Sequence, residues 1–290
     1  MKAHPWPRPP TVGWGGVRLS AGGFEIEATS VGGVETCYQL PQLGVCLDIG
    51  RCPDGAERQG TLLLTHAHID HAAGLAYYVS MRGLMGAPPP RVFCPASAHP
   101  ALSTILEAWS TLQADTKRCD LVGVQPGDEI PLGKTAFARV FRSPHRISTV
   151  GYTLCTRVKK LRPDLAAEPQ AAIADRARAG EVVTEEHITP QLCFPGDTLI
   201  DVLESEPTVT TSRVLLLECT FFGTKVTPER ARRNGHIHID QIAERAHMFA
   251  NEVVVLTHFS RRYHREEIEA EVAEKLPAGL RDRLVLLFEG

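Results

Sequence analysis

The stretch Thr65-His66-Ala67-His68-Ile69-Asp70-His71 decides the fold of this chain. It follows the apolar run 61–64, which is typical of a short buried strand that ends at a polar site. The next segment, residues 71–82, has the apolar spacing of a helix. The polar cluster is therefore predicted to lie on a strand-to-helix turn, where its side chains can converge.

Three imidazoles and a carboxylate within six residues favour metal binding, whereas the simpler interpretation is a solvated His-rich turn. His66 and His68 alternate along an extended backbone, so both can point to the same side. Asp70 and His71 come after them and can serve a second, adjacent ion. Imidazole and carboxylate together suit zinc or another borderline divalent ion.

The pattern H-x-H-x-D-H after an apolar strand resembles the signature of the metallo-β-lactamase superfamily. This resemblance implies an α/β fold, the metallo-β-lactamase αββα four-layer sandwich. It also implies a two-metal site at the edge of the two sheets.

Composition predicts one globular domain in a reducing compartment. The chain has 290 residues, of which 43% are hydrophobic, and no linker or repeat divides it. We expect a single domain over residues 1–290 with an arm inserted at about 157–187. The eight cysteines form no C-x-x-C pair and are interpreted as free thiols. With neither a signal peptide nor a membrane-spanning run in view, we expect a cytoplasmic protein with no membrane partner.

The order of elements is predicted from apolar periodicity. Strands are expected at 24–29, 36–40, 44–48, 61–65, 91–94, 120–124, 136–142, 149–156, 191–194, 213–217, 253–256 and 283–288. Helices are expected at 71–82, 97–114, 239–250 and 264–275. Residues 1–20 are interpreted as a partly ordered leader, and the Ala-rich, charged segment 163–180 as a protruding helical hairpin or arm, or else a solvated surface helix.

Three further candidate metal ligands each follow an apolar strand: His145, Asp197 and His258. A lone histidine at a strand end is usually an ordinary rim residue, but three such ends beside the turn cluster favour a shared site. Two sets are predicted, with Asp197 bridging them through its two oxygens: His66, His68 and His145 on one ion, and Asp70, His71 and His258 on the other. Two ions so held would activate a water and clamp a phosphoryl group, with Asp70 as ligand and candidate base.

His236 is the remaining histidine in a suggestive position, directly after Gly235. An imidazole outside the metal shell is a suitable general acid near neutral pH, although a polar loop at a helix entry would look the same. Glu218 ends an apolar strand and could orient His236. Asp48 also ends a strand and is interpreted either as the partner of a ligand histidine or as an ordinary turn residue.

Four later motifs are similar, in order, to those of the tRNase Z family: Gly196-Asp197-Thr198, Glu218-Cys219-Thr220-Phe221, Gly235-His236 and Thr257-His258-Phe259-Ser260-Arg261-Arg262-Tyr263. The likeness covers about residues 24–275 and is nearest to the short form found in plants. It implies an endoribonuclease that matures tRNA 3′ ends, the same seven metal ligands, and a proton-donor role for His236. Ile237 departs from the family, which usually has a small hydroxyl residue there.

The resemblance also implies two Zn²⁺ per chain, with Mn²⁺ or Fe²⁺ as alternatives, and precursor tRNA as substrate. In this family an arm holds the tRNA away from the cut, often across a homodimer. A basic cluster before the inserted arm is predicted to contact RNA phosphates: Arg157, Lys159, Lys160 and Arg162. An ordinary solvated face is the alternative, and the net charge of −3 is weak evidence against RNA binding.

Three functions are compared. The leading hypothesis is a zinc-dependent phosphodiesterase that removes the 3′ trailer of precursor tRNA. The second is a hydrolase of the same fold that acts on a small phosphodiester. The third is a non-catalytic RNA-binding or scaffolding protein, for which a metal set and a proton donor would have no use.

Overall fold

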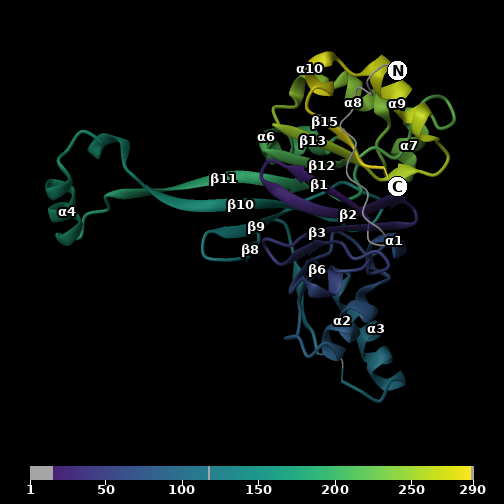
Figure 1. Ribbon diagram of the computed structural model, residues 1–290, viewed down its shortest axis with the longest axis horizontal. Coiled ribbons are helices and arrows are strands. Elements are labelled where there is room, and N and C mark those ends of the chain that lie inside the picture. Colours follow the sequence, from purple (N-terminus) through teal and green to yellow (C-terminus); the bar gives the residue numbers. More distant parts are fainter. Residues whose placement is uncertain (1–15, 117, 289–290) are drawn as a thin grey trace.

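The computed structural model describes residues 16–116 and 118–288. Two sheets pack face to face, and each outer face is covered by helices, α2 and α3 on one side and α8 to α10 on the other (Figure 1). The predicted αββα order of layers is therefore confirmed. Within the described residues, no helix combines the length and the apolar character needed to cross a membrane.

The first sheet has eight strands in the order β1-β2-β3-β4-β5-β6-β7, with β14 added beside β2. Their bounds are β1 (Val17–Ala21), β2 (Phe24–Gly32), β3 (Glu35–Leu40), β4 (Val45–Leu47), β5 (Thr61–Leu63), β6 (Arg91–Pro95), β7 (Asp120–Val124) and β14 (Phe259–Ser260). Neighbours are antiparallel from β1 to β4 and parallel from β4 to β7.

The second sheet has seven strands in the order β15-β13-β12-β11-β10-β9-β8. Their bounds are β8 (Glu129–Pro131), β9 (Ala136–Arg142), β10 (Val150–Leu161), β11 (Thr184–Phe194), β12 (Val214–Glu218), β13 (Val253–Thr257) and β15 (Leu284–Leu286). Because β9 and β11 both run antiparallel to β10, they point the same way as β12 and β13. The carboxyl ends of β9, β11, β12 and β13 therefore meet at one edge, where open sheets commonly carry their sites.

The described helices are α1 (Ile69–Ala72), α2 (Leu75–Leu84), α3 (His99–Leu112), α4 (Gln170–Arg178), α5 (Val202–Ser205), α6 (Pro207–Thr211), α7 (Pro228–Asn234), α8 (Ile239–Glu244), α9 (Arg265–Lys275) and α10 (Ala278–Arg281), with short 3₁₀ turns η1 (Ala56–Arg58), η2 (Pro163–Leu165) and η3 (Ala246–Met248). Side chains that alternate along β12 fill two different cores. Leu216 packs between the sheets, whereas Leu215 and Leu217 pack beneath the outer helices. This burial on both faces explains why the strand is an unbroken apolar run.

Two tyrosines lock the sheets together beside the candidate ligands. Tyr38 of β3 donates to the Thr257 hydroxyl across the sheets (2.6 Å), one residue before His258. Tyr152 of β10 donates to the carbonyl of Leu64 (2.7 Å), two residues before His66. Because both tyrosines are buried, these bonds fix where the ligand loops leave their strands.

The structure corrects several expectations. Residues 17–21, placed in a leader, form strand β1; residues 1–15 lie outside the described part. The helix expected at 71–82 is two helices that meet at Gly74, where a Cβ atom would lie 2.5 Å from the Cys52 nitrogen. The helix expected at 239–250 ends at Glu244 and continues only as η3. Helices α5, α6, α7 and α10 are too short to show a clear period in the sequence.

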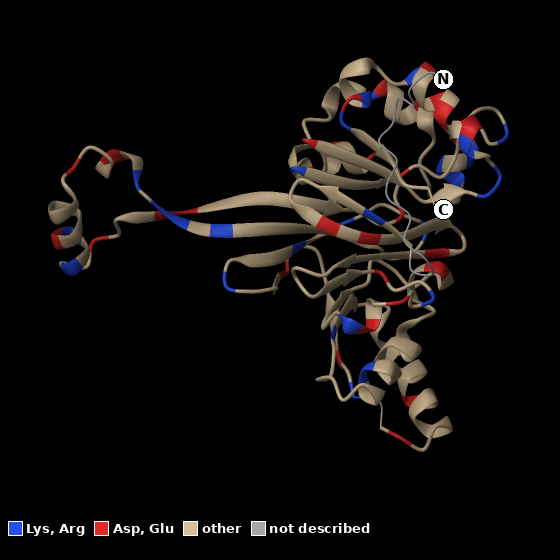
Figure 2. Cartoon of the chain, in the orientation of Figure 1, with Lys and Arg blue, Asp and Glu red and all other residues tan. Residues whose placement is uncertain are grey.

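The segment 163–180 protrudes as an arm, as one of the two interpretations had it, but it holds η2 and the single helix α4, not a helical hairpin, and a β-ribbon carries it. Strand β9 accompanies β10 only as far as Thr156, beyond which β10 pairs with β11 alone up to Leu161 and Thr184. The ribbon leaves the body and carries α4 at its far end (Figure 1). Acidic and basic residues both occur along it (Figure 2).

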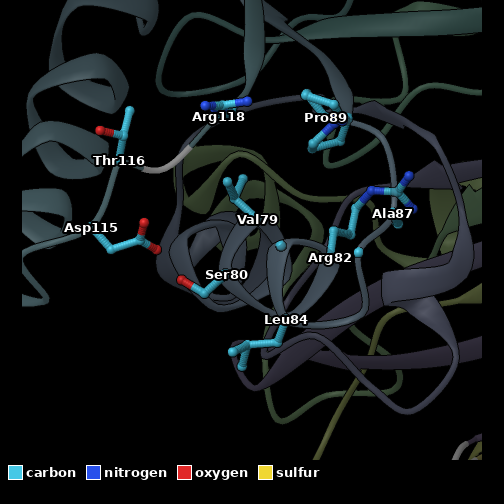
Figure 3. A pocket seen from close by; sticks show the side chains of 12 residues that line it. Val79, Ser80, Arg82, Leu84, Ala87, Pro89, Asp115, Thr116 and Arg118 are labelled. Atoms are coloured by element: carbon cyan, nitrogen blue, oxygen red, sulfur yellow. The ribbon is translucent and has the colours of Figure 1, made fainter.

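A hollow of about 470 Å³ lies between α2, the Pro-rich turn 87–90 and the residues after α3 (Figure 3). Its buried arginine, Arg82, donates to the carbonyls of Glu57, Gln59 and Pro88 at 2.8–2.9 Å. That guanidinium therefore holds the loop before β5 in place. None of the seven predicted metal ligands belongs to the described lining of the hollow.

Candidate metal centre

The turn after β5 carries four of the predicted ligands into the cleft between the sheets. His66 is fully buried, and His68 is the N-cap residue of α1. Asp70 and His71 lie within α1 and are buried. The first pair therefore lies on the turn and the second pair on the four-residue helix that follows it, as the sequence predicts for two adjacent ions.

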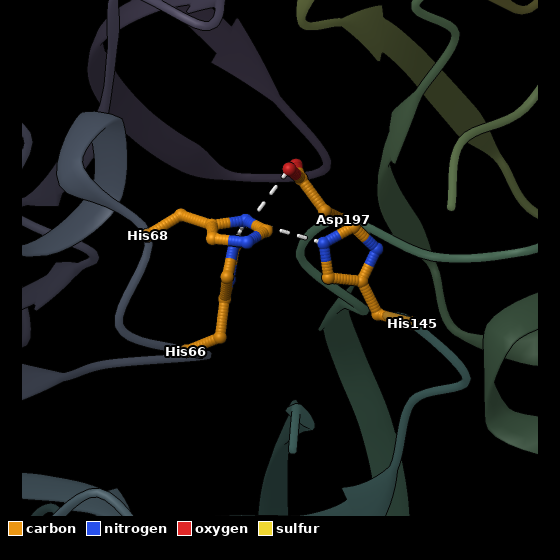
Figure 4. A group of neighbouring side chains, drawn as sticks. All are labelled: His66, His68, His145 and Asp197. Atoms are coloured by element: carbon orange, nitrogen blue, oxygen red, sulfur yellow. Dashed lines mark hydrogen bonds and ion pairs between the residues drawn. The ribbon is translucent and has the colours of Figure 1, made fainter. Parts of the chain in front are cut away.

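One group of ligand atoms converges from three segments (Figure 4): His66, His68, His145 and Asp197. His66 Nε2 lies 3.0 Å from His68 Nδ1, which lies 3.3 Å from His145 Nε2. Asp197 Oδ2 lies 3.7 Å from His66 Nε2. All four donors lie within 4.8 Å of one another, so a single cation could contact each of them.

The second group comprises Asp70, His71, Asp197 and His258, all buried. Asp197 Oδ1 lies 3.3 Å from Nε2 of His71 and 3.3 Å from Nε2 of His258. Asp70 Oδ2 lies 3.5 Å from His258 Nε2. Because Oδ1 of Asp197 faces this group and Oδ2 faces the other, this carboxylate is placed to bridge two ions.

The residues present fit a divalent cation. Nε2 of His71 and Nε2 of His258 are buried and have no hydrogen-bond partner, a condition that costs about 1–3 kcal/mol for a buried polar atom. Burial raises the pKa of Asp197, but the charges of His258 and His71 outweigh it and hold that pKa well below its ordinary value. The site thus offers an ionised carboxylate and unpaired imidazole nitrogens, the donors that divalent transition metals use.

Asp48 and Thr65 fix the orientation of two ligands. Asp48 accepts from His71 Nδ1 (2.7 Å) and from the Thr65 hydroxyl (2.8 Å). Having donated its only proton, that hydroxyl must accept from His66 Nδ1 (2.9 Å). Both imidazoles therefore present an Nε2 lone pair to the site. Of the two interpretations of Asp48, this geometry supports the ligand-partner one.

Glu218 and Thr220 form a matching arrangement on the other sheet. Glu218 Oε2 accepts from the Thr220 hydroxyl (2.6 Å), which in turn accepts from His258 Nδ1 (2.9 Å). Glu218 Oε1 accepts from His236 Nδ1 (2.9 Å). His258 has a φ of 61°, a strained conformation for a residue other than glycine, so these bonds also hold the backbone in place.

His236 lies beside the metal centre without belonging to either ligand group. Its ring centroid is 5.4 Å from that of His145 and 5.5 Å from that of His258. Burial lowers the pKa of His236, but the Glu218 carboxylate outweighs it and raises that pKa to about 9. Gly235, with φ 87°, permits the His145 ring to approach the backbone just before His236, since a Cβ atom on residue 235 would lie 2.7 Å from His145 Nδ1.

The predicted basic cluster does not form one patch. On strand β10, Arg157 and Lys159 point to the opposite face from Lys160, and Arg162 lies just beyond the strand. Lys159 and Lys160 stand opposite Glu186 and Glu185. Arg157 pairs with Glu129 (2.7 Å) and Arg162 with Asp164 (2.7 Å).

Sequence reasoning missed Thr65 and Thr220, whose hydroxyls link carboxylates to ligand histidines. The available signal was their place: Thr65 directly precedes the ligand His66 after an apolar run, and Thr220 lies two residues after Glu218, which ends an apolar strand. A threonine in that position is also an ordinary strand residue, so the pattern alone could not single them out.

Comparison with known proteins agrees with this geometry. A family model described as the beta-lactamase superfamily domain matches residues 51–259, and the chain therefore belongs to that superfamily. Its fold is similar to that of the metallo-beta-lactamase fold protein YhfI from Bacillus subtilis, with a TM-score of 0.58 and 13% identity over 90% of this chain and 94% of that one.

Two relatives from Arabidopsis thaliana narrow the assignment. The chain is 36% identical to tRNase Z TRZ1 over 92% of its own length and 96% of the relative. It is 35% identical to chloroplastic tRNase Z TRZ2 over 95% of its length and 77% of the relative. The chain belongs to the tRNase Z family.

Proposed function

We propose that this chain is a metal-dependent endoribonuclease that removes the 3′ trailer from precursor tRNA. The observation that carries the proposal is the pair of ligand groups sharing Asp197 beside the His236–Glu218 pair. This arrangement supplies both a place for a phosphodiester and a proton donor for its leaving oxygen. The two Arabidopsis relatives are named tRNase Z, which supports RNA as the substrate.

We propose two divalent ions per chain, with Zn²⁺ preferred to Mn²⁺ or Fe²⁺ because five of the seven ligands are imidazoles. The first ion would be held by His66, His68 and His145, the second by Asp70, His71 and His258, and both by Asp197. When bound, the ions would polarise the scissile phosphate and activate a water.

The chain's own residues would then handle the protons. Asp70 Oδ2 accepts from the Gly33 amide (2.9 Å), which orients the carboxylate and supports its proposed roles as ligand and candidate base. His236 would protonate the departing 3′-oxygen of the tRNA through Nε2, because Glu218 occupies its Nδ1. The tRNA would keep a 3′-hydroxyl and the trailer would leave with a 5′-phosphate.

We further propose that the chain is one domain whose arm contacts tRNA within a homodimer. His145 and Asp197 lie at one end of the β9–β10–β11 group, and α4 lies at the other end of β10 and β11. An arm that runs away from its own metal centre could reach a tRNA held by a second copy. Localisation in the cytoplasm remains a prediction; one relative is named as chloroplastic.

The test is cleavage of end-labelled precursor tRNA after chelation, followed by stepwise addition of Zn²⁺. We expect cleavage to return with metal and to yield the two end groups named above. Turnover of bis-(p-nitrophenyl) phosphate without precursor cleavage would select a small-phosphodiester hydrolase. Absence of both bound metal and turnover would select a non-catalytic RNA-binding protein.

A further inference from the structure

Four exposed arginines lie next to the metal ligands along the chain, and we call them the arginine rim. Arg142 and Arg146 flank His145, and Arg261 and Arg262 follow His258. Within residues 16–116 and 118–288, none of the four forms an ion pair with a carboxylate. Their charges are therefore available to an external anion.

Two of these arginines lie beside residues that neighbour His236. The Cγ atom of Arg146 lies against Gly235, 2.8 Å from where a Cβ atom would be. The Arg262 guanidinium lies 5.9 Å from the centroid of the Phe221 ring, which is itself 5.8 Å from that of His236. Arg146 and Arg262 therefore each lie within one residue of the surroundings of His236.

Arg142 lines a hollow of about 530 Å³ whose wall also includes His145. Most of the lining is apolar or hydroxyl-bearing, with Pro144, Ile147 and Leu199 beside the ligand, and Arg142 is its one Lys or Arg side chain among the described residues. The volume lies within the range of about 300–1,000 Å³ that is usual for small-ligand sites. A nucleotide next to the scissile phosphate would fit there with its phosphate toward Arg142.

On the arm, in contrast, carboxylates balance the positive charges. Residues 157–187 contain six Lys or Arg and six Asp or Glu, a net charge of zero with His neutral. Its four arginines are all in ion pairs, with Arg176 bound to Glu168 (2.8 Å) and Arg178 to Asp175 (2.7 Å) in addition to the two pairs already described. Such pairs lower the local potential that would attract a phosphate.

We propose that the arginine rim binds phosphates of the RNA strand on either side of the scissile bond and supplies the charge-dependent part of tRNA affinity. This inference rests on the proposed function, since it names how the RNA is held at that site. Guanidinium groups suit the task because they bind phosphate oxygens in pairs. The arm would then contact tRNA by shape, with little contribution from charge.

The test compares two double variants that remove the same charge, Arg146→Ala/Arg262→Ala on the rim and Arg162→Ala/Arg176→Ala on the arm. The first readout is the Kd for mature tRNA, which does not depend on cleavage. At about 0.15 M salt, loss of two phosphate contacts should weaken binding about 20-fold in the rim variant, since each contact contributes a salt slope of roughly 0.7–0.9. The arm variant should stay within about threefold of wild type.

The second readout is the ratio of kcat/KM for precursor tRNA to kcat/KM for bis-(p-nitrophenyl) phosphate. This ratio should fall in the rim variant and stay constant in the arm variant. Weaker tRNA binding by the arm variant alone, or a rim variant that loses both substrates equally, would overturn the inference. Failure of the wild type to cut precursor tRNA would instead overturn the proposed function, and the Kd comparison would still decide the inference.

Discussion

Arginines occur both on the arm and on the arginine rim, but the two sets differ in whether they form ion pairs. The arm's basic residues are adjacent in sequence, yet its arginines are neutralised by carboxylates on the same ribbon or on β8. The rim's arginines form two pairs more than a hundred residues apart in the chain, yet both pairs lie next to metal ligands and have no ion pairs among the described residues. Charge clustering in a sequence therefore does not measure charge available to a partner.

Histidine–carboxylate pairs allow the same comparison. His236 donates to Glu218 at 2.9 Å at the buried site, and His187 faces Glu185 at 3.0 Å on the exposed arm. The distances are alike, but solvent screens the buried pair less than the exposed one, and the Glu218 carboxylate raises the pKa of His236 to about 9. Matched substitutions in the two regions can therefore distinguish a catalytic role of a histidine–carboxylate pair from the effect of losing such a pair on the surface.

The largest expected effect is that of Asp197→Ala. Because this carboxylate faces both ligand groups, its loss should remove both ions and reduce cleavage to background. Elemental analysis and precursor cleavage measure the two outcomes. Asp164→Ala is the control on the arm, where the carboxylate binds only Arg162, and it should keep full metal content. An Asp197→Ala protein that retains two ions would contradict the bridging role.

His236→Ala should keep its metals and lose precursor cleavage by about 10²–10⁴-fold, the usual range for general acid–base catalysis. The loss should be smaller with bis-(p-nitrophenyl) phosphate, whose leaving group needs no proton. His187→Ala is the matched control and should behave as wild type with both substrates. An equal loss on the two substrates would rule out the proton-donor role of His236.

A smaller effect is expected for Glu218→Gln on the pH profile. A proton donor works below its pKa, so activity should fall as pH rises through the pKa of His236. The negative charge of Glu218 raises that pKa to about 9, and its removal should move the high-pH limb of kcat/KM to lower pH. Glu185→Gln on the arm should leave the limb in place, and an unmoved limb in Glu218→Gln would show that His236 is not the titrating acid.

The positions of most strands could be predicted from the sequence because these strands are apolar runs, and the layer order was implied by the resemblance that the ligand turn carries. The arm was misjudged because Ala and paired charges between 163 and 180 have good helix propensity, whereas the flanking residues 157–161 and 184–188 form a ribbon only by pairing across the insertion. Pairing between distant segments has no local period to detect.

In the candidate site, too, residues with a local sequence signal could be predicted and residues that depend on long-range packing could not. The seven proposed ligands come after strands that end at one edge of the sheets, and the structure brings them together in the two groups described above. Thr65 and Thr220 were not predicted because their contribution is a hydroxyl hydrogen bond between two other side chains, which depends on how the two sheets are packed.

The central claim, that charge-dependent RNA binding belongs to the rim and not to the arm, is tested most directly by the salt dependence of tRNA binding. A chain with residues 162–183 replaced by a two-residue turn is suitable, because Leu161 and Thr184 already face each other across the ribbon. The slope of log Kd against log salt should stay within about 0.5 of wild type in this chain and fall by roughly 1.4–1.8 in Arg146→Ala/Arg262→Ala. A slope that falls in the shortened chain and stays unchanged in the rim variant would contradict the account.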